Sequence, residues 1–209
     1  MLKTSFIVAL ATISTASFAG QWQVKIGGSL LQPSAKHNTL AEGLVTDAKA
    51  DNGASFTPSI EYFFEDPRFS AELLLATPFK HEVKASINGQ PSAQIAEFKH
   101  LPPTLTFKYH FINSTPITPY FGAGVTAAIP FQERARGDLE GAKLRANMTY
   151  GLAGQVGVMV NPIKDNKNWG VFADVRYAKV EPDLKIDGVK IGTLNIDPWV
   201  YTAGISYRF

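Results

Sequence analysis

The chain has 209 residues, 45% of them hydrophobic, with 20 basic and 18 acidic side chains and no cysteine. This length indicates one domain or at most two, and a formal net charge of +2 is too small to indicate nucleic acid as a partner. The absence of cysteine excludes disulfides, thiolate metal sites and cysteine nucleophiles. We find no phosphate-binding loop and no complete calcium loop, and therefore expect no cofactor.

The first 19 residues have the organisation of a signal peptide. Lys3 supplies a positive charge, residues 6–13 are mostly apolar, and Ser17 and Ala19 are small residues suited to a cleavage site. The apolar stretch is shorter than the roughly 20 residues that span a bilayer, which argues against an uncleaved anchor. We expect cleavage after Ala19 and a mature protein of residues 20–209.

Eight segments of the mature chain have the character of β-strands. In chain order they are 21–30, 54–64, 69–79, 101–111, 118–131, 148–160, 169–180 and 199–209. In the first, Trp22, Val24 and Ile26 share one face, and Gln23 and Lys25 share the other. Such alternation predicts strands with one apolar face. A length of about ten residues suits a tilted transmembrane strand.

The connections between these segments alternate in length. The long ones are 32–53, 80–100, 132–147 and 181–196, and the shorter ones are 65–68, 113–117 and 161–168. Outer-membrane barrels have long external loops and short periplasmic turns. The sequence therefore predicts an all-β fold, an eight-stranded antiparallel transmembrane β-barrel with four long external loops and both termini in the periplasm.

Seven charged residues indicate which face of the strands points inward. They lie opposite the aromatic residues of their strands, near the short turns: Lys25, Glu61, Glu72, Lys108, Asp174, Arg176 and Arg208. On a lipid-facing surface near the midplane each would cost on the order of 2–4 kcal/mol, whereas inside a narrow barrel they can pair. We call these seven residues the charged belt.

A soluble barrel of the lipocalin type could instead expose the charged belt to water. Aromatic residues at the same strand ends argue against it, because they resemble the interfacial girdle of a membrane barrel. These residues are Trp22, Phe64, Phe69, Tyr120, Trp169 and Phe209.

Small or apolar residues occupy the inward positions of the outer half of the barrel. They are Ser29, Thr57, Leu74, Ala76, Pro78 and Thr104, and they predict a cavity that opens to the outside. Prolines, which cannot donate to a strand ladder, fall toward the loop ends of three consecutive strands: Pro58, Pro78, Pro102 and Pro103. We predict a lateral opening of the wall there; the alternative is that these prolines only end strands and shape loops.

Six blocks of sequence resemble the outer membrane protein W (OmpW) family. They read ELLLATPFKH at 72–81, HLPPTL at 100–105, PYFGAGV at 119–125, GQVGV at 154–158, DPWV at 197–200 and YRF at 207–209. The resemblance follows the mature chain from end to end. It implies an eight-stranded barrel with a narrow, largely hydrophobic channel that is associated with the passage of small apolar molecules.

An enzymatic role is not expected. Some outer-membrane barrels modify lipid A with a histidine and a serine two positions apart on one strand face, and none of the four histidines has that partner. Glu61 and Glu72 could form an acid–base pair, but carboxylates near several lysines and arginines are more often structural.

Two functions remain open. The first is an outer-membrane channel that passes small hydrophobic solutes from an external lumen to a lateral exit. The second is a non-transporting structural or adhesion barrel whose external loops bind a partner. The small outer-half residues favour the first. The expected partners are outer-membrane lipid, small hydrophobic solutes and the barrel-insertion machinery, for which the terminal Phe209 is the candidate assembly signal.

Overall fold

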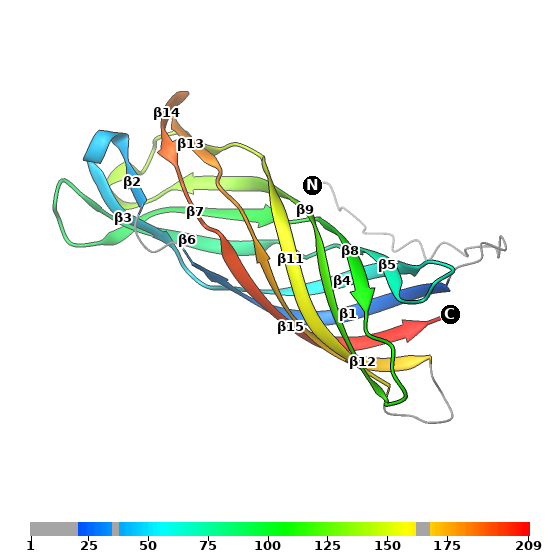
Figure 1. The fold of residues 1–209 in the computed structure, drawn as a ribbon. Helices are drawn as coiled ribbons and strands as arrows, with labels where there is room; N and C mark the ends of the chain where they lie inside the picture. Colours follow the sequence, from blue (N-terminus) through cyan, green and yellow to red (C-terminus); the bar gives the residue numbers. More distant parts are fainter. Residues whose placement is uncertain (1–20, 35–37, 162–167) are drawn as a thin grey trace, which may run out of the picture.

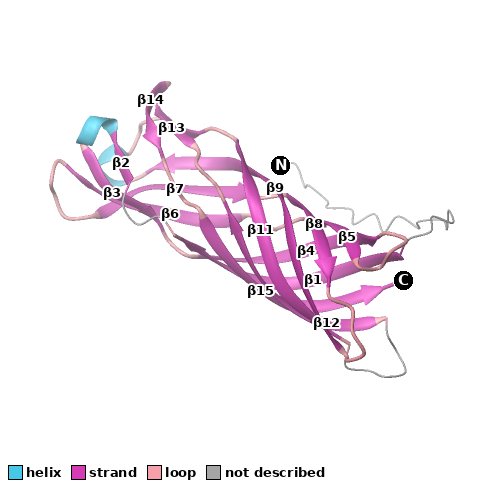
Figure 2. Cartoon of the chain, viewed as in Figure 1, coloured by secondary structure: helices cyan, strands magenta, loops and turns pink. Residues whose placement is uncertain are grey.

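The computed structural model describes residues 21–34, 38–161 and 168–209, and the predicted signal peptide lies outside these ranges. The fold is all-β, and eight strands pair antiparallel in a closed ring (Figures 1 and 2). In ring order these are β1 (Gln21–Pro33), β4 (Gly53–Phe63), β5 (Phe69–Leu74), β8 (Thr104–His110), β9 (Ile117–Ala135), β11 (Thr149–Val160), β12 (Trp169–Ala178) and β15 (Pro198–Arg208). The predicted eight-stranded antiparallel barrel is confirmed.

One end of the barrel carries the short connections after β4 and β8, the start of β1 and the end of β15; we call it the turn end. The other end, the loop end, continues into an extension (Figure 1). The extension contains β2 (Asn38–Leu40), β3 (Val45–Ala50), β6 (Phe79–Ile87), β7 (Ala93–Leu101), β10 (Leu144–Ala146), β13 (Asp183–Ile186) and β14 (Val189–Thr193), with short 3-10 turns at Ala41–Gly43 and Gly137–Leu139.

The extension differs from the predicted long loops, because most of it is sheet with a hydrophobic core of its own. β9 runs out of the barrel and pairs there with β7, which pairs with β6. Side chains such as Leu40, Val83, Phe98 and Leu194 are buried together in this core. Burial of apolar surface stabilises the extension as an ordered continuation of the barrel wall.

The barrel wall has polar side chains on its inner face and apolar side chains on its outer face, which is the reverse of a soluble protein. Lys25 and Lys108 on the inner face are fully buried, while Leu152 on the outer face is 75% exposed. Outward apolar side chains recur on every barrel strand, among them Ile26, Leu73, Leu105, Val125, Val156, Val171 and Ile205. A soluble lipocalin-type barrel has the opposite arrangement, and this alternative is rejected. No helix in the described ranges is long and apolar enough to cross a membrane.

Aromatic rings surround the turn end. Neighbouring rings are in contact, with centroids 4.9 Å apart for Trp22 and Tyr62 and 5.0 Å apart for Trp169 and Tyr207. Such a girdle fits the membrane–water interface. Tyr120 is not part of it, because its side chain points inward and is only 2% exposed.

The barrel wall is interrupted near the loop end. β5 pairs with β8 up to Leu74 and Thr104, and pairing resumes between β6 and β7 at Phe79 and His100. In between, no backbone hydrogen bond joins residues 75–78 to residues 101–103, although both segments are described. We call these two segments the wall break.

Each segment of the wall break is instead hydrogen-bonded to the strand on its other side, which is β4 for residues 75–78 and β9 for residues 101–103. The N–H groups of Leu75 and Thr77 donate to carbonyls of β4 at 2.8 Å each, and Ala127 of β9 donates to the carbonyl of Pro103 at 3.0 Å. The strands therefore part from each other without losing their attachment to the rest of the wall.

Candidate functional site in the barrel lumen

The charged belt begins with two lysines held between two glutamates. Lys25 Nζ lies 2.9 Å from Glu72 and 3.5 Å from Glu61, and Lys108 Nζ lies 2.8 Å from Glu61 and 3.2 Å from Glu72. All four side chains are fully buried. Buried charges of this kind are tolerated only when each one is paired and hydrogen-bonded.

A second group joins this cluster from β9, β11 and β12. Arg176 Nη2 lies 3.2 Å from Glu72, and its Nε lies 3.1 Å from Asp174. Tyr120 donates its hydroxyl to Asp174 at 3.1 Å, and Gln155 donates its amide to Asp174 at 3.1 Å. Six belt residues thus form one hydrogen-bonded layer across the lumen.

Arg208, the seventh belt residue, lies beside this layer without a carboxylate partner among the described residues. Its Nε donates to Gln23 at 3.3 Å, and its guanidinium lies 3.7 Å from the ring centroid of Phe63. Gln23 in turn donates to Glu61 at 3.5 Å, which connects Arg208 to the layer indirectly.

A histidine and a serine meet in the layer, on neighbouring strands where the sequence pattern did not place them. The Oγ of Ser70 lies 2.9 Å from His110 Nε2, and Glu61 lies 3.2 Å from the same nitrogen. Ser70 also donates to Glu61 at 2.6 Å. A nucleophile needs a base oriented by a third group through the other ring nitrogen. Here Ser70 and Glu61 both contact Nε2 of His110, so the carboxylate does not orient the imidazole through its other nitrogen. We therefore interpret the contact as structural.

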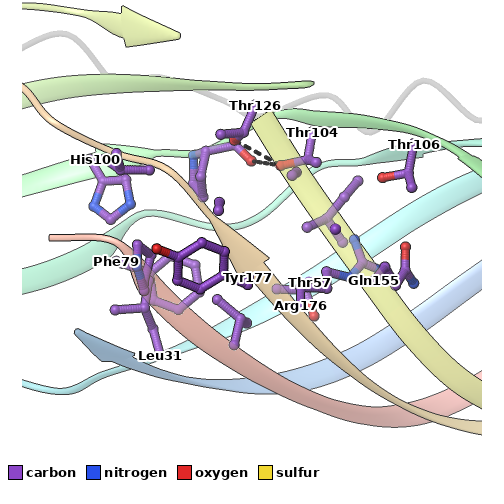
Figure 3. A pocket seen from close by; sticks show the side chains of 18 residues that line it. Leu31, Thr57, Phe79, His100, Thr104, Thr106, Thr126, Gln155, Arg176 and Tyr177 are labelled. Atoms are coloured by element: carbon purple, nitrogen blue, oxygen red, sulfur yellow. Dashed lines mark hydrogen bonds between the residues drawn. The ribbon is translucent and has the colours of Figure 1, made fainter. Parts of the chain in front are cut away.

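Above the layer lies a cavity of about 40 Å³ with a mostly apolar lining (Figure 3). Of the six predicted lining residues, Thr57, Leu74 and Thr104 border it. Ser29 is buried and is hydrogen-bonded to Thr57 at 2.8 Å and to Thr202 at 2.7 Å. Its hydroxyl therefore ties neighbouring strands together.

The expected alternation fails within the wall break, which changes the positions of two predicted lining residues. Ala76 is half-buried there, and Pro78 is exposed and does not line the lumen. The reason is that β5 ends at Leu74, so the inward face is not carried through residues 75–78. When β6 begins, Phe79 points inward in place of Pro78 and lines the cavity.

The four prolines lie in or beside the wall break. Pro58 is in β4, where its carbonyl accepts from Leu75 at 2.8 Å but its nitrogen can donate nothing in return. Pro78 is the last residue of one broken segment, and Pro102 and Pro103 belong to the other. Pro102 also lines the cavity. The structure thus brings all four prolines to one region of the wall.

Two histidines that the sequence pattern assigned to loop positions lie at the loop end of the cavity. His81 and His100, in β6 and β7 beyond the barrel strands, stack with ring centroids 4.9 Å apart. Burial lowers the pKa of both imidazoles, that of His100 to about 3, so both are neutral near pH 7. The alternation of Phe79, His81 and Val83 would have predicted this inward face.

The hydrophobic core of the extension adjoins the cavity through Val180, which belongs to both. An opening to the outside was expected above the small lining residues. Instead, apolar side chains of the extension fill the space between the cavity and the loop tips. The loop end of the cavity is therefore bordered by apolar groups.

A closed ring of eight antiparallel strands, with a lipid-compatible exterior and a charged interior, defines a β-barrel of the bacterial outer membrane. The sequence pattern of the OmpW family matches residues 18–209. The chain belongs to the OmpW family, as its sequence blocks predicted, and is a protein of the outer membrane.

Individual relatives agree with this assignment. The chain is 32% identical to an uncharacterized outer-membrane protein, y4mB, of Sinorhizobium fredii, over 99% of this chain and 87% of the relative. It is 34% identical to outer membrane protein W of Vibrio cholerae, over 72% of this chain and 71% of the relative. Its fold is similar to the crystal structure of OprG from Pseudomonas aeruginosa, with a TM-score of 0.78, 24% identity and coverage of 91% and 96% of the two chains.

Proposed function

We propose that the protein is a channel that takes small hydrophobic molecules into its lumen from outside the cell and releases them sideways into the outer membrane. The observation that carries this proposal is the position of the cavity. It lies between the apolar core of the extension and the charged belt, and it borders the wall break.

The charged belt acts as a floor. An apolar molecule that continued toward the turn end would have to separate buried ion pairs such as Lys25–Glu72 and Lys108–Glu61. Breaking one buried pair costs roughly 3–5 kcal/mol, and an apolar solute offers no compensating hydrogen bond. A straight passage through the barrel is therefore unfavourable for this class of molecule.

The wall break offers another route. Residues on both of its sides, namely Leu74, Phe79, His100, Pro102 and Thr104, line the cavity. Outside it, Leu75 presents an exposed apolar side chain toward lipid. An apolar molecule can move from the cavity to the bilayer without contacting a charge and without breaking a ladder hydrogen bond between the two segments.

The proposal includes a definite orientation of the barrel in the membrane. The extension and the loop end face the outside, and the turn end with both termini of the barrel faces the periplasm, as in barrels with short periplasmic turns. The solute would then leave the lumen in the half of the wall that faces the outer leaflet.

A reversible seal of the wall break tests the route. The chain has no cysteine, so Ala76→Cys with Pro102→Cys introduces a single pair across the break. The matched control is Leu73→Cys with Leu105→Cys, because these residues are already partners in the intact β5–β8 ladder. Uptake of hexane by proteoliposomes should fall when the first pair is oxidised, recover on reduction, and not change in the control. Equal uptake by the oxidised and reduced forms of the first pair would contradict the proposal.

A further inference from the structure

The unmet hydrogen-bonding atoms of the described chain gather around the cavity. Five buried side-chain atoms have no hydrogen-bond partner within the described residues: His81 Nε2, His100 Nδ1, His100 Nε2, Gln155 Oε1 and Arg176 Nη1. Four of these atoms belong to residues that line the cavity, and the fifth is on the ring stacked against His100. Because leaving a buried polar atom unpaired is costly, such a concentration points to a ligand with polar atoms of its own.

One nitrogen in the floor of the cavity is without a hydrogen-bond partner. Arg176 uses Nε for Asp174 at 3.1 Å and Nη2 for Glu72 at 3.2 Å, which leaves Nη1 without a partner. The side chain itself is 94% buried, since its exposed fraction is 6%. The guanidinium is held in place by two carboxylates, so its third nitrogen has a fixed direction.

The floor also presents one free acceptor. Gln155 donates its Nε2 to Asp174 at 3.1 Å and to Glu72 at 3.3 Å. Since both partners are carboxylates, they fix the amide with Nε2 toward the charged belt and leave Oε1 free. Gln155 and Arg176 are direct cross-strand partners in β11 and β12, which brings the free donor and the free acceptor together.

A hydroxyl group satisfies this pair with a single oxygen, which accepts from Arg176 and donates to Gln155. A primary amide does the same with two atoms, whereas a hydrocarbon leaves both groups unpaired. The rest of the lining is suited to a chain, with apolar side chains such as Leu31, Leu74 and Val200. A cavity of about 40 Å³ has room for roughly three water-sized groups before any side chain moves.

We propose that the cavity binds small apolar molecules that carry an uncharged oxygen-bearing group, such as alcohols and primary amides. The polar group lies between Arg176 and Gln155, and the apolar chain extends toward Phe79 and His100, which lie at the other end of the cavity (Figure 3). This inference rests on the proposed function, because it names the class of molecule that the channel selects.

Binding is tested with two probes of equal size, pentan-1-ol and hexane, titrated into the protein in lipid nanodiscs. The reporters are the NMR signals of the backbone amides of Ala153 and Ala178, which line the cavity. We expect saturable shifts and a dissociation constant, expressed as concentration in the lipid phase, that is about tenfold lower for pentan-1-ol, as one hydrogen bond to a charged group predicts.

Two leucine variants locate the polar contact. Gln155→Leu removes the acceptor but keeps Arg176, so it should weaken pentan-1-ol binding by about threefold to fivefold while leaving hexane binding unchanged. Gln23→Leu is the matched control, because Gln23 is an equally buried glutamine that hydrogen-bonds the charged belt away from the cavity. It should bind both probes like the unmodified protein.

Equal affinities for pentan-1-ol and hexane, shifts that never saturate, or identical behaviour of the two leucine variants would each overturn the inference. The lateral route is judged separately by the cysteine pair across the wall break. If sealing still blocks hexane uptake while pentan-1-ol binds no more tightly than hexane, the inferred selectivity is wrong and the proposed channel function is retained. If pentan-1-ol binds selectively while sealing has no effect, the site stands and the lateral route is wrong.

Discussion

Replacing Arg176 with methionine should destabilise the barrel chiefly through Asp174. Glu72 loses one of three cations but keeps Lys25 at 2.9 Å and Lys108 at 3.2 Å. Asp174 has Arg176 as its one cationic partner within the described residues, at 3.1 Å. The substitution therefore leaves one carboxylate buried without an ion-pair partner within 4 Å.

The size of the effect follows from what Asp174 retains. Loss of one partner from a dry buried pair costs about 3–5 kcal/mol. Asp174 still accepts hydrogen bonds from Tyr120 and Gln155, both at 3.1 Å, and these continue to stabilise the charge. We therefore expect a loss near the lower bound, about 3 kcal/mol in the free energy of unfolding.

Urea unfolding in lipid vesicles, followed by tryptophan fluorescence, measures this loss. Adding Asp174→Asn to Arg176→Met removes the unpaired charge and should recover most of the stability. Asp174→Asn alone should cost less than Arg176→Met, because Arg176 keeps Glu72 at 3.2 Å. If Arg176→Met costs under about 1 kcal/mol and the double variant is no more stable, the layer is hydrated and the reasoning from dry ion pairs fails.

Three further predictions concern other parts of the molecule. Acidification should destabilise the extension. Between pH 6.5 and about pH 3, His100 binds a proton in the unfolded chain but not in the folded one. The free energy of unfolding therefore falls by up to about 1.4 kcal/mol for each pH unit in that window. Hydrogen-exchange protection of β6 and β7 should drop accordingly, and an undiminished drop in a variant with both His81→Phe and His100→Phe would point elsewhere, because burial lowers the pKa of both imidazoles. Deleting Phe209, whose N–H donates to Trp22 at 2.9 Å, should block assembly in cells yet permit refolding in vitro, and normal outer-membrane levels would refute its role as an assembly signal. Pro58→Val supplies the missing donor to Leu75, so it should stabilise the barrel by about 0.5–1.5 kcal/mol and slow hexane uptake, and unchanged uptake would show that this bond does not limit the opening.

The barrel itself could be predicted from the sequence because its strands obey one simple constraint. Each spans lipid on one side and a polar lumen on the other, so alternation persists along β1, β11 and β15. Charge placement then indicated which face was inward, and six of the seven belt residues meet in one layer.

Two features could not be read from alternation. Tyr120 was placed in the aromatic girdle, but its ring points inward beside Gly157, where a Cβ would collide with it. The space for this ring exists because a glycine lies opposite it on the neighbouring strand, which the sequence of β9 alone does not show. Gly122 and Gly124 also make it difficult to assign the faces of β9 from the sequence. The shift of face at Pro78 was missed for a similar reason, since a strand that breaks and restarts need not keep its phase.

The extension was missed because loop composition hides short strands. Residues 79–87 and 93–101 pair with each other, and residues 93–101 also pair with β9, but neither stretch is apolar enough to stand out alone. The cavity's free polar atoms were also beyond sequence reasoning. Gln155 and Arg176 each look satisfied by the charged belt, and only the geometry shows which of their atoms remain free.

Ionic conductance and apolar uptake, recorded on one preparation each of Lys25→Met and of the unmodified protein, test most directly whether solutes leave through the wall or through the floor, because Lys25 belongs to the charged belt but does not line the cavity. Opening the charged belt should raise the conductance, because ions must cross the layer. Hexane uptake should stay the same, because the wall break lies above that layer. A parallel rise of uptake and conductance would show that apolar solutes cross the floor, and would contradict the lateral route.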